Sequence, residues 1–198
     1  ALTALGHEAV VHAPAFPGQR FFRAPDCETV LAPASACGAG LATLVQTRIG
    51  DYVAHFEDAA HRRFDMYHAH DGISGNALAT LKERGMIPGF ARTIHHIDAF
   101  DDPRIEAWQT RSIMAADRHF VVSRLWQAAL RRDLGIDAAI VGNGVDRRVF
   151  TLRRDGREVA LRQRLGLGDG PVLLAVGGVE GRKNTLRMLQ AFRQLRAI

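Results

Sequence analysis

Residues 65–98, DMYHAHDGISGNALATLKERGMIPGFARTIHHID, contain the pattern that decides the fold. Residues 65–71 form a short strand-like run. Residues 75–85 have apolar side chains at helical spacing and end in a glycine, and residues 90–98 form a second strand-like run. A strand, a crossover helix and a second strand make a β-α-β unit, in which the two strands run parallel. The stretch therefore predicts an α/β fold built on a parallel sheet.

The same alternation extends over most of the chain. Strands are expected at 8–14, 29–33, 118–123 and 138–142, and helices at 40–64, 104–116 and 124–134, after a helical tail that ends at Leu5 with Gly6 as its cap. Helices of this length can cross between parallel strands. We therefore expect a Rossmann-like parallel sheet with helices on both faces.

The last quarter of the chain has a different pattern. Residues 151–170 are charged and punctuated by glycine, which predicts a linker with a short helix at about 157–165. Residues 171–178, PVLLAVGG, predict a new strand, and residues 183–197 predict a new helix. The periodicity leaves open whether this strand extends the first sheet or begins a second domain. Because the chain opens and closes inside helical patterns, we expect it to be cut at both ends.

The composition is that of an ordinary soluble globular protein, with 47% hydrophobic and 24% charged residues. No run approaches the ~18 apolar residues of a transmembrane helix, and the N-terminus lacks the basic and apolar regions of a signal peptide. Cys27 and Cys37 stand alone, without a CxxC motif or a histidine at metal-ligand spacing. We therefore expect reduced thiols and a cytoplasmic protein.

The formal net charge is +5, and nearly all of the basic residues are arginines scattered through the predicted helices. Charges spread in this way usually form solvated helix faces; the alternative is a weak attraction to anionic substrates or to a membrane surface. Aromatic residues are not interleaved with the basic ones, so the sequence gives no support for nucleic-acid binding.

Polar side chains stand at the ends of four predicted strands. They are His70-Asp71, His95-His96, Ser123 and Asn143-Gly144. The carboxyl ends of parallel strands meet at one edge of the sheet, where ligands of such folds bind. This edge is therefore the predicted site. Simpler roles compete with it: Asp71 and Ser123 could cap the helices that follow them, and a histidine at a strand end could be held by the backbone.

A second pattern, VLLAVGGVEGRKNTLRMLQAF at 172–192, points to phosphate. A strand, a glycine turn and a basic helix start bring backbone amides and positive charge to one place. Gly177 and Gly178 would let a phosphate approach the backbone, and Arg182 and Lys183 would supply the cation. Such groups stabilise the charge that develops on a departing phosphate.

Six stretches, in this order, resemble the motifs of the GT-B glycosyltransferases of family 4. They are LTALGHEAVVHAP, DMYHAHDG, RTIHHIDAF, ADRHFVVSRLWQAAL, VGNGVDRRVF and LLAVGGVEGRKNTLRMLQAF. The resemblance depends on all six motifs occurring in the same order as in the family, and it covers nearly the whole chain. The chain departs from the family pattern at Gly178, where the family has an arginine five residues before the lysine that corresponds to Lys183.

The resemblance implies two Rossmann-like domains that face each other across a cleft. Residues 1–150 would form the acceptor-side domain, residues 151–170 a linker, and residues 171–198 the start of the nucleotide-sugar domain. The family's first strand and its glycine-rich loop would precede Ala1, and most of the donor domain would follow Ile198. The isolated chain is accordingly expected to be inactive.

The implied reaction is transfer of a hexose from a UDP-, GDP- or ADP-sugar to a sugar, lipid or small-molecule acceptor, with retention of configuration. The nucleotide-sugar is a substrate, and no cofactor and no metal are expected. The resemblance places His95 beside the transferred sugar as the catalytic residue. His70, Asp71 and His96 would lie on the acceptor side, although His96 should point to the opposite face from His95.

The remaining positions are assigned in the same way. Lys183, Arg182, Gly177 and Gly178 would bind the donor phosphates. The turn of Asn143, Gly144 and Asp146 would lie at the domain junction, where a structural role is expected because Asn and Gly accept a positive φ and Asp bonds nearby amides.

Two other functions stay open. Another Rossmann-type enzyme that uses NAD or a nucleotide-sugar, such as an epimerase, would need a GxGxxG motif after its first strand, and the visible chain has none. A non-catalytic module of GT-B-like fold that has lost its donor site is supported by Gly178 alone.

Overall fold

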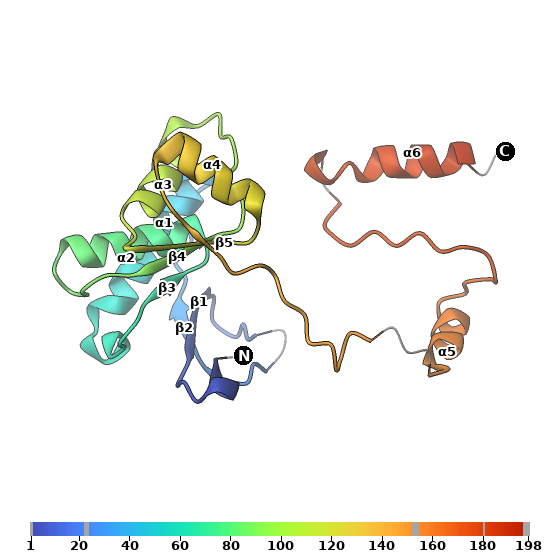
Figure 1. The fold of residues 1–198 in the computed structure, drawn as a ribbon, viewed down its shortest axis with the longest axis horizontal. Helices are drawn as coiled ribbons and strands as arrows, with labels where there is room; N and C mark the ends of the chain where they lie inside the picture. Colours follow the sequence, from blue (N-terminus) through green and yellow to red (C-terminus); the bar gives the residue numbers. More distant parts are fainter. Residues whose placement is uncertain (1, 22–23, 152–154, 180, 196–198) are drawn as a thin grey trace. The chain divides into compact units, whose positions relative to one another are not determined.

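The computed structural model describes residues 2–21, 24–151, 155–179 and 181–195. Its contacts divide the chain into two units, Ala1–Gly144 and Val145–Ile198, and each unit is described by itself. Strands β1 to β6 and helices α1 to α4 belong to the first unit, and α5 and α6 to the second (Figure 1).

The first unit alternates strands and helices from end to end. Its elements are η1 (Thr3–Leu5), β1 (Val10–Ala15), β2 (Glu28–Pro33), α1 (Leu41–Glu57), η2 (Ala59–Arg62), β3 (His68–Ala69), α2 (Gly72–Glu83), β4 (Ala91–Ile94), α3 (Pro103–Met114), β5 (Arg118–Val121), α4 (Arg124–Leu134) and β6 (Ala139–Ile140). This order confirms the predicted α/β fold. The predicted helical tail is a single 3-10 turn, which Gly6 ends in the left-handed conformation expected of a cap.

All strand pairs are parallel, but the strands form two sheets rather than one. β1 pairs with β2, and β3, β4, β5 and β6 follow one another in a four-stranded sheet. No ladder joins β1 to β3 among the described residues. In the larger sheet, Ala69 of β3 lies opposite Arg92 of β4, and Ile94 lies opposite Val121 of β5.

Helices α1 to α4 pack on one face of the larger sheet. Its inward residues, Ala69, Ile94 and Val121, are fully buried in two apolar clusters. These clusters hold Tyr52, Val53 and Phe56 of α1, Ala77, Leu78 and Leu81 of α2, Ile113 of α3 and Leu130 of α4. Each crossover from β3 to β6 advances in the same direction, and right-handed crossovers of that kind place their helices on the same face.

Helix α1 is shorter than the predicted helix at 40–64. It ends at Glu57 because Asp58 adopts an extended conformation and begins a separate 3-10 turn, η2. The Asp58 side chain accepts a hydrogen bond from the amide of Ala60 at 2.8 Å, which satisfies a donor at the start of that turn. No helix of the described chain is long and apolar enough to cross a membrane.

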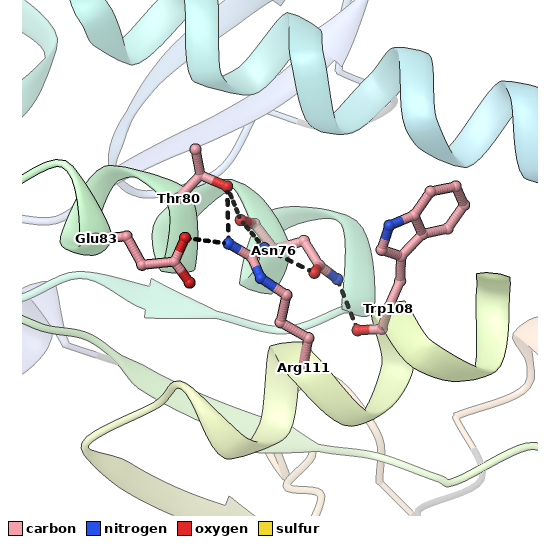
Figure 2. A network of polar contacts seen from close by, with 5 residues as sticks. All are labelled: Asn76, Thr80, Glu83, Trp108 and Arg111. Atoms are coloured by element: carbon pink, nitrogen blue, oxygen red, sulfur yellow. Dashed lines mark hydrogen bonds and ion pairs between the residues drawn. The ribbon is translucent and has the colours of Figure 1, made fainter.

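A buried polar network joins α2 to α3 (Figure 2). The amide nitrogen of Asn76 donates to the carbonyl oxygens of Gly72 and Trp108, both at 2.7 Å. Its amide oxygen accepts from Arg111 at 3.0 Å, and Arg111 continues to Thr80 at 3.1 Å and to Glu83 at 2.7 Å. Asn76 is fully buried, so its donors and acceptor need these partners. The network fixes the first turn of α2, which begins beside the predicted site.

A cluster of three histidines packs β1 against α1. His12 Nδ1 lies 3.0 Å from His55 Nε2, and the His55 ring stacks on His61 with centroids 4.0 Å apart. Phe56 and Phe64 flank the His12 ring. Burial, aided by His55 and His61, lowers the pKa of His12 to about 4. Burial in this cluster therefore favours the neutral form of the His12 ring.

The second unit contains α5 (Arg157–Arg164), η3 (Gly181–Lys183) and α6 (Thr185–Leu195). The two helices correspond to the predictions at about 157–165 and at 183–197, although the end of the latter lies outside the described residues. The prediction of a strand at 171–178 is wrong. The described residues of this unit contain no strand that could pair with it, and an unpaired strand leaves its backbone donors and acceptors without partners.

We predict that Asn76→Ala lowers the free energy of unfolding by about 2–4 kcal/mol, because it removes the buried hydrogen bonds of the Asn76 amide to the carbonyls of Gly72 and Trp108 and to Arg111. Glu83→Ala is the matched control at the exposed end of the same network and should cost less than about 1 kcal/mol. Chemical denaturation followed by tryptophan fluorescence measures both, since Trp108 and Trp126 lie in the first unit. Equal losses in the two variants would contradict this account.

We predict that the first unit loses stability as the pH falls from about 6.5 to about 4. The folded pKa of His12 lies below its ordinary value of 6.5, so the unfolded chain binds the proton more readily in this window. The stabilisation is complete above pH 6.5 and decreases by about 1–3 kcal/mol on the way to pH 4.

Denaturation curves at several pH values, compared with those of His12→Phe, isolate this contribution from the other histidines. The variant should show a shallower decrease, whereas His7→Phe, at an exposed position outside the cluster, should match the wild type. A His12→Phe variant with the full pH dependence of the wild type would show that His12 is not its source.

Candidate functional site

The carboxyl ends of β3 and β4 bring three histidines into a row. His68 lies in β3, His70 follows this strand directly, and His95 follows β4 directly. His70 Nδ1 is 3.2 Å from His95 Nε2, which is hydrogen-bonding distance. The His70 ring also stacks on His68, with centroids 4.4 Å apart and planes at 29°. His70 and His95 both follow strands at the edge that the sequence indicated, and the structure brings their rings into contact.

The alternation of side chains along the strands produces this row. His68 and His70 are two residues apart, so both leave β3 on the face opposite the helices. Thr93 and His95 share that face of β4, and Thr93 Oγ1 lies 2.8 Å from His68 Nε2. Phe120 of β5 packs against the His68 ring at a centroid distance of 5.6 Å.

The electrostatics at His68 and His70 favour neutral rings. Desolvation lowers the pKa of His68 to about 4, and His70, Arg92 and His95 add to the effect. The pKa of His70 is also lowered, first by desolvation and then by His95 and Arg92, with a partial offset from Asp71. His70 is therefore neutral near pH 7. In the hydrogen bond between His70 and His95, one of the two facing nitrogens is protonated and donates, and the other accepts the hydrogen bond.

Arg92 lies on the helix side of β4 and is 6% exposed. Its Nη1 donates to the carbonyl of Thr93, and its Nε is buried without a hydrogen-bond partner among the described residues. Burial lowers its pKa to about 10, with a partial offset from Asp71. Gly75 lets α2 approach α3 closely, because a Cβ at Gly75 would lie 2.8 Å from the Cβ of Ser112; Arg92 lies 3.4 Å from the same position.

The predicted acceptor-side residues have distinct local roles. Asp71 caps α2: its Oδ1 accepts from the amide of Ser74 at 2.7 Å and from the Ser74 hydroxyl at 3.1 Å. Capping is the simpler of the two roles considered for Asp71. The helix that it caps, α2, also carries Asn76 of the network in Figure 2. Nε2 of His96 lies 2.9 Å from a carboxylate oxygen of Asp98, in an exposed contact.

Ser123 and Asp146 make local hydrogen bonds. Ser123 caps α4 by accepting from the amide of Trp126 at 3.4 Å. In the predicted turn, Asp146 Oδ1 accepts from the amide of Arg148 at 2.9 Å, and hydrogen bonds from Arg148 lower the pKa of Asp146 to about 2. The left-handed residue of this segment is Gly142, with a φ of 65°, rather than Asn143 or Gly144.

The predicted phosphate segment lies in the second unit. Gly177 has a φ of 150°, and a Cβ built there would lie 3.7 Å from Cε of Lys183. The Lys183 side chain therefore folds back over Gly177, while the space above Gly178 is open. Helix α6 begins two residues after Lys183. The side chain of Arg182 lies outside the part of the chain that the structure describes.

Sequence reasoning missed His68 and Arg92, although each left a signal. His68 stands two residues before His70 and so belongs to the same face of the strand. Arg92 is a charged residue inside an otherwise buried strand.

Within the described residues, no three His, Cys, Asp or Glu side chains are grouped so that they could hold a metal ion. A cavity of about 480 Å³ lies beside β1, lined partly by Gln19 and Arg20, and does not include the histidine row.

Comparison with known proteins defines the class. Residues 1–149 match the family model described as Glycosyltransferase Family 4, so the chain belongs to glycosyltransferase family 4. No curated protein matched the chain. Among solved structures, it is similar to a sucrose-phosphate synthase from Thermosynechococcus elongatus, with a TM-score of 0.56 and 20% identity over 83% of this chain and 90% of that one. The likeness confirms the parallel α/β fold of the GT-B enzymes.

Proposed function

We propose that these residues carry the acceptor-side domain, and the start of the donor domain, of a longer retaining glycosyltransferase. The enzyme would transfer a hexose from a nucleotide-sugar to a sugar, lipid or small-molecule acceptor. The observation that supports this proposal best is the contact between His70 and His95, at the carboxyl ends of two adjacent parallel strands, in a chain of family 4. That edge is where ligands bind in sheets of this kind.

In this proposal, His95 lies beside the transferred sugar and bonds one of its oxygens. An imidazole suits this place because a neutral ring carries one donor and one acceptor. Asp71 has a second carboxylate oxygen beyond the one that caps α2, and that oxygen would orient an acceptor hydroxyl. Lys183, with Arg182 and the backbone at Gly177 and Gly178, would bind the donor phosphates from the second unit.

Retention would follow from departure of the nucleoside diphosphate and attack by the acceptor on the same face of the sugar. The donor's own phosphate would take the acceptor proton. This route is supported by a row that consists of imidazoles, while the neighbouring Asp71 is bound through Oδ1 to the first turn of α2. A glycosidase-type reaction would need two carboxylates on opposite sides of the bond.

We predict that the full-length protein releases nucleoside diphosphate from at least one nucleotide-sugar in a panel of UDP-, GDP- and ADP-hexoses. His95→Ala should lower kcat by about 10²-fold or more, because it removes a contact to the reacting sugar. Lys183→Ala should lower kcat/KM for the donor by about 10²–10³-fold, because it removes a cation from the leaving phosphate.

His7→Ala, on the exposed N-terminal segment, is the matched histidine control and should behave as the wild type. The proposal fails if no member of the panel is turned over, or if both His95→Ala and Lys183→Ala retain wild-type rates. Transfer by the 198-residue chain alone would overturn its assignment as part of a longer enzyme.

A further inference from the structure

One ring nitrogen of His95 is already occupied. Its Nε2 lies 3.2 Å from Nδ1 of His70. The described part of the chain offers no hydrogen-bond partner to its other nitrogen, Nδ1. We propose that His70 is a positioning residue for His95: it holds Nε2 of His95 and so leaves Nδ1 as the nitrogen that meets the transferred sugar. The last part of this statement rests on the proposed function; the hold of His70 on His95 does not.

The sheet itself keeps the His70 ring in place. His70 stacks on His68, and His68 Nε2 is tied to the hydroxyl of Thr93 at 2.8 Å. Thr93 is buried in β4, the same strand that carries His95. The contacts thus run from Thr93 of β4 to His68 of β3, on to His70 just after β3, and back to His95 just after β4. A ring held by packing and by such supporting bonds keeps one orientation.

The backbone of His70 is also fixed on both sides. Ala69, the preceding residue, is fully buried and paired with Arg92 in the ladder. Asp71, the following residue, caps α2, whose first turn is held by Asn76 through the carbonyl of Gly72. The His70 side chain therefore projects from a rigid segment although the residue itself is exposed, which is what a positioning residue requires.

This role differs from the one inferred from sequence, in which His70 lies on the acceptor side of the cleft. A residue that acts only on the acceptor matters only when an acceptor is present. A residue that positions His95 also matters when water replaces the acceptor, because His95 lies beside the donor sugar in both reactions. Hydrolysis of the nucleotide-sugar without acceptor therefore separates the two roles.

The first test reads the tautomer of His95 directly and needs no substrate. In protein labelled with ¹⁵N at histidine, the ring nitrogens of neutral His95 should show one tautomer near pH 7, because a partner on Nε2 selects it. His70→Ala should convert His95 to a mixture of the two tautomers, and His7→Ala should change nothing. An unchanged His95 spectrum in His70→Ala, in a variant with wild-type stability, would overturn the proposal.

The second test measures hydrolysis of the nucleotide-sugar by the full-length protein without acceptor. His70→Ala should lower kcat by about tenfold or more and leave KM for the donor within about twofold, because a misplaced ring weakens the reacting geometry. The double variant with His95→Ala should lose no more than His95→Ala alone, since His70 acts through His95.

Wild-type hydrolysis combined with impaired transfer in His70→Ala would overturn the proposal in favour of direct acceptor contact. If the protein turns over no nucleotide-sugar at all, the proposed function fails, while the tautomer measurement still decides whether His70 holds His95.

Discussion

The parallel register of β3 and β4 is the constraint on which the site depends. It sets Ala69, the last residue of β3, opposite Arg92 of β4, and His70 and His95, which follow the two strands directly, lie within hydrogen-bonding distance of each other. A slip by one residue would turn each side chain to the other face. The register is secured where one face is buried, and Ala69, with no exposed surface, lies on that face.

The two faces of the four-stranded sheet carry different kinds of side chains. The helix side carries the apolar clusters and the buried charge of Arg92, while the opposite side carries the imidazoles of His68, His70 and His95. A buried cation without a hydrogen bond at Nε costs stability, and such costs concentrate at functional sites. Helix α2 links the faces, because its cap, Asp71, follows His70 and its first turn is fixed by Asn76.

Much of this could be read from the sequence, since the β-α-β order and the polar strand ends follow from local periodicity. The rule that parallel strands end at one edge was sufficient to predict that His70 and His95 meet. It did not show that α1 to α4 share one face, which depends on the spatial order of strands, or that 171–178 forms no strand, which depends on a partner. His68 was readable from alternation; the unpaired Nε of Arg92 was not, because it results from how the side chains around it pack.

The central claim, that the strand register assembles one continuous row of rings, is tested most directly by ring-to-ring nuclear Overhauser effects in the histidine-labelled protein. The account predicts contacts from His68 to His70 and from His70 to His95, and none from His70 to His96, whose side chain pairs with Asp98. A spectrum in which His70 contacts His96, or lacks any contact to His95, would contradict it.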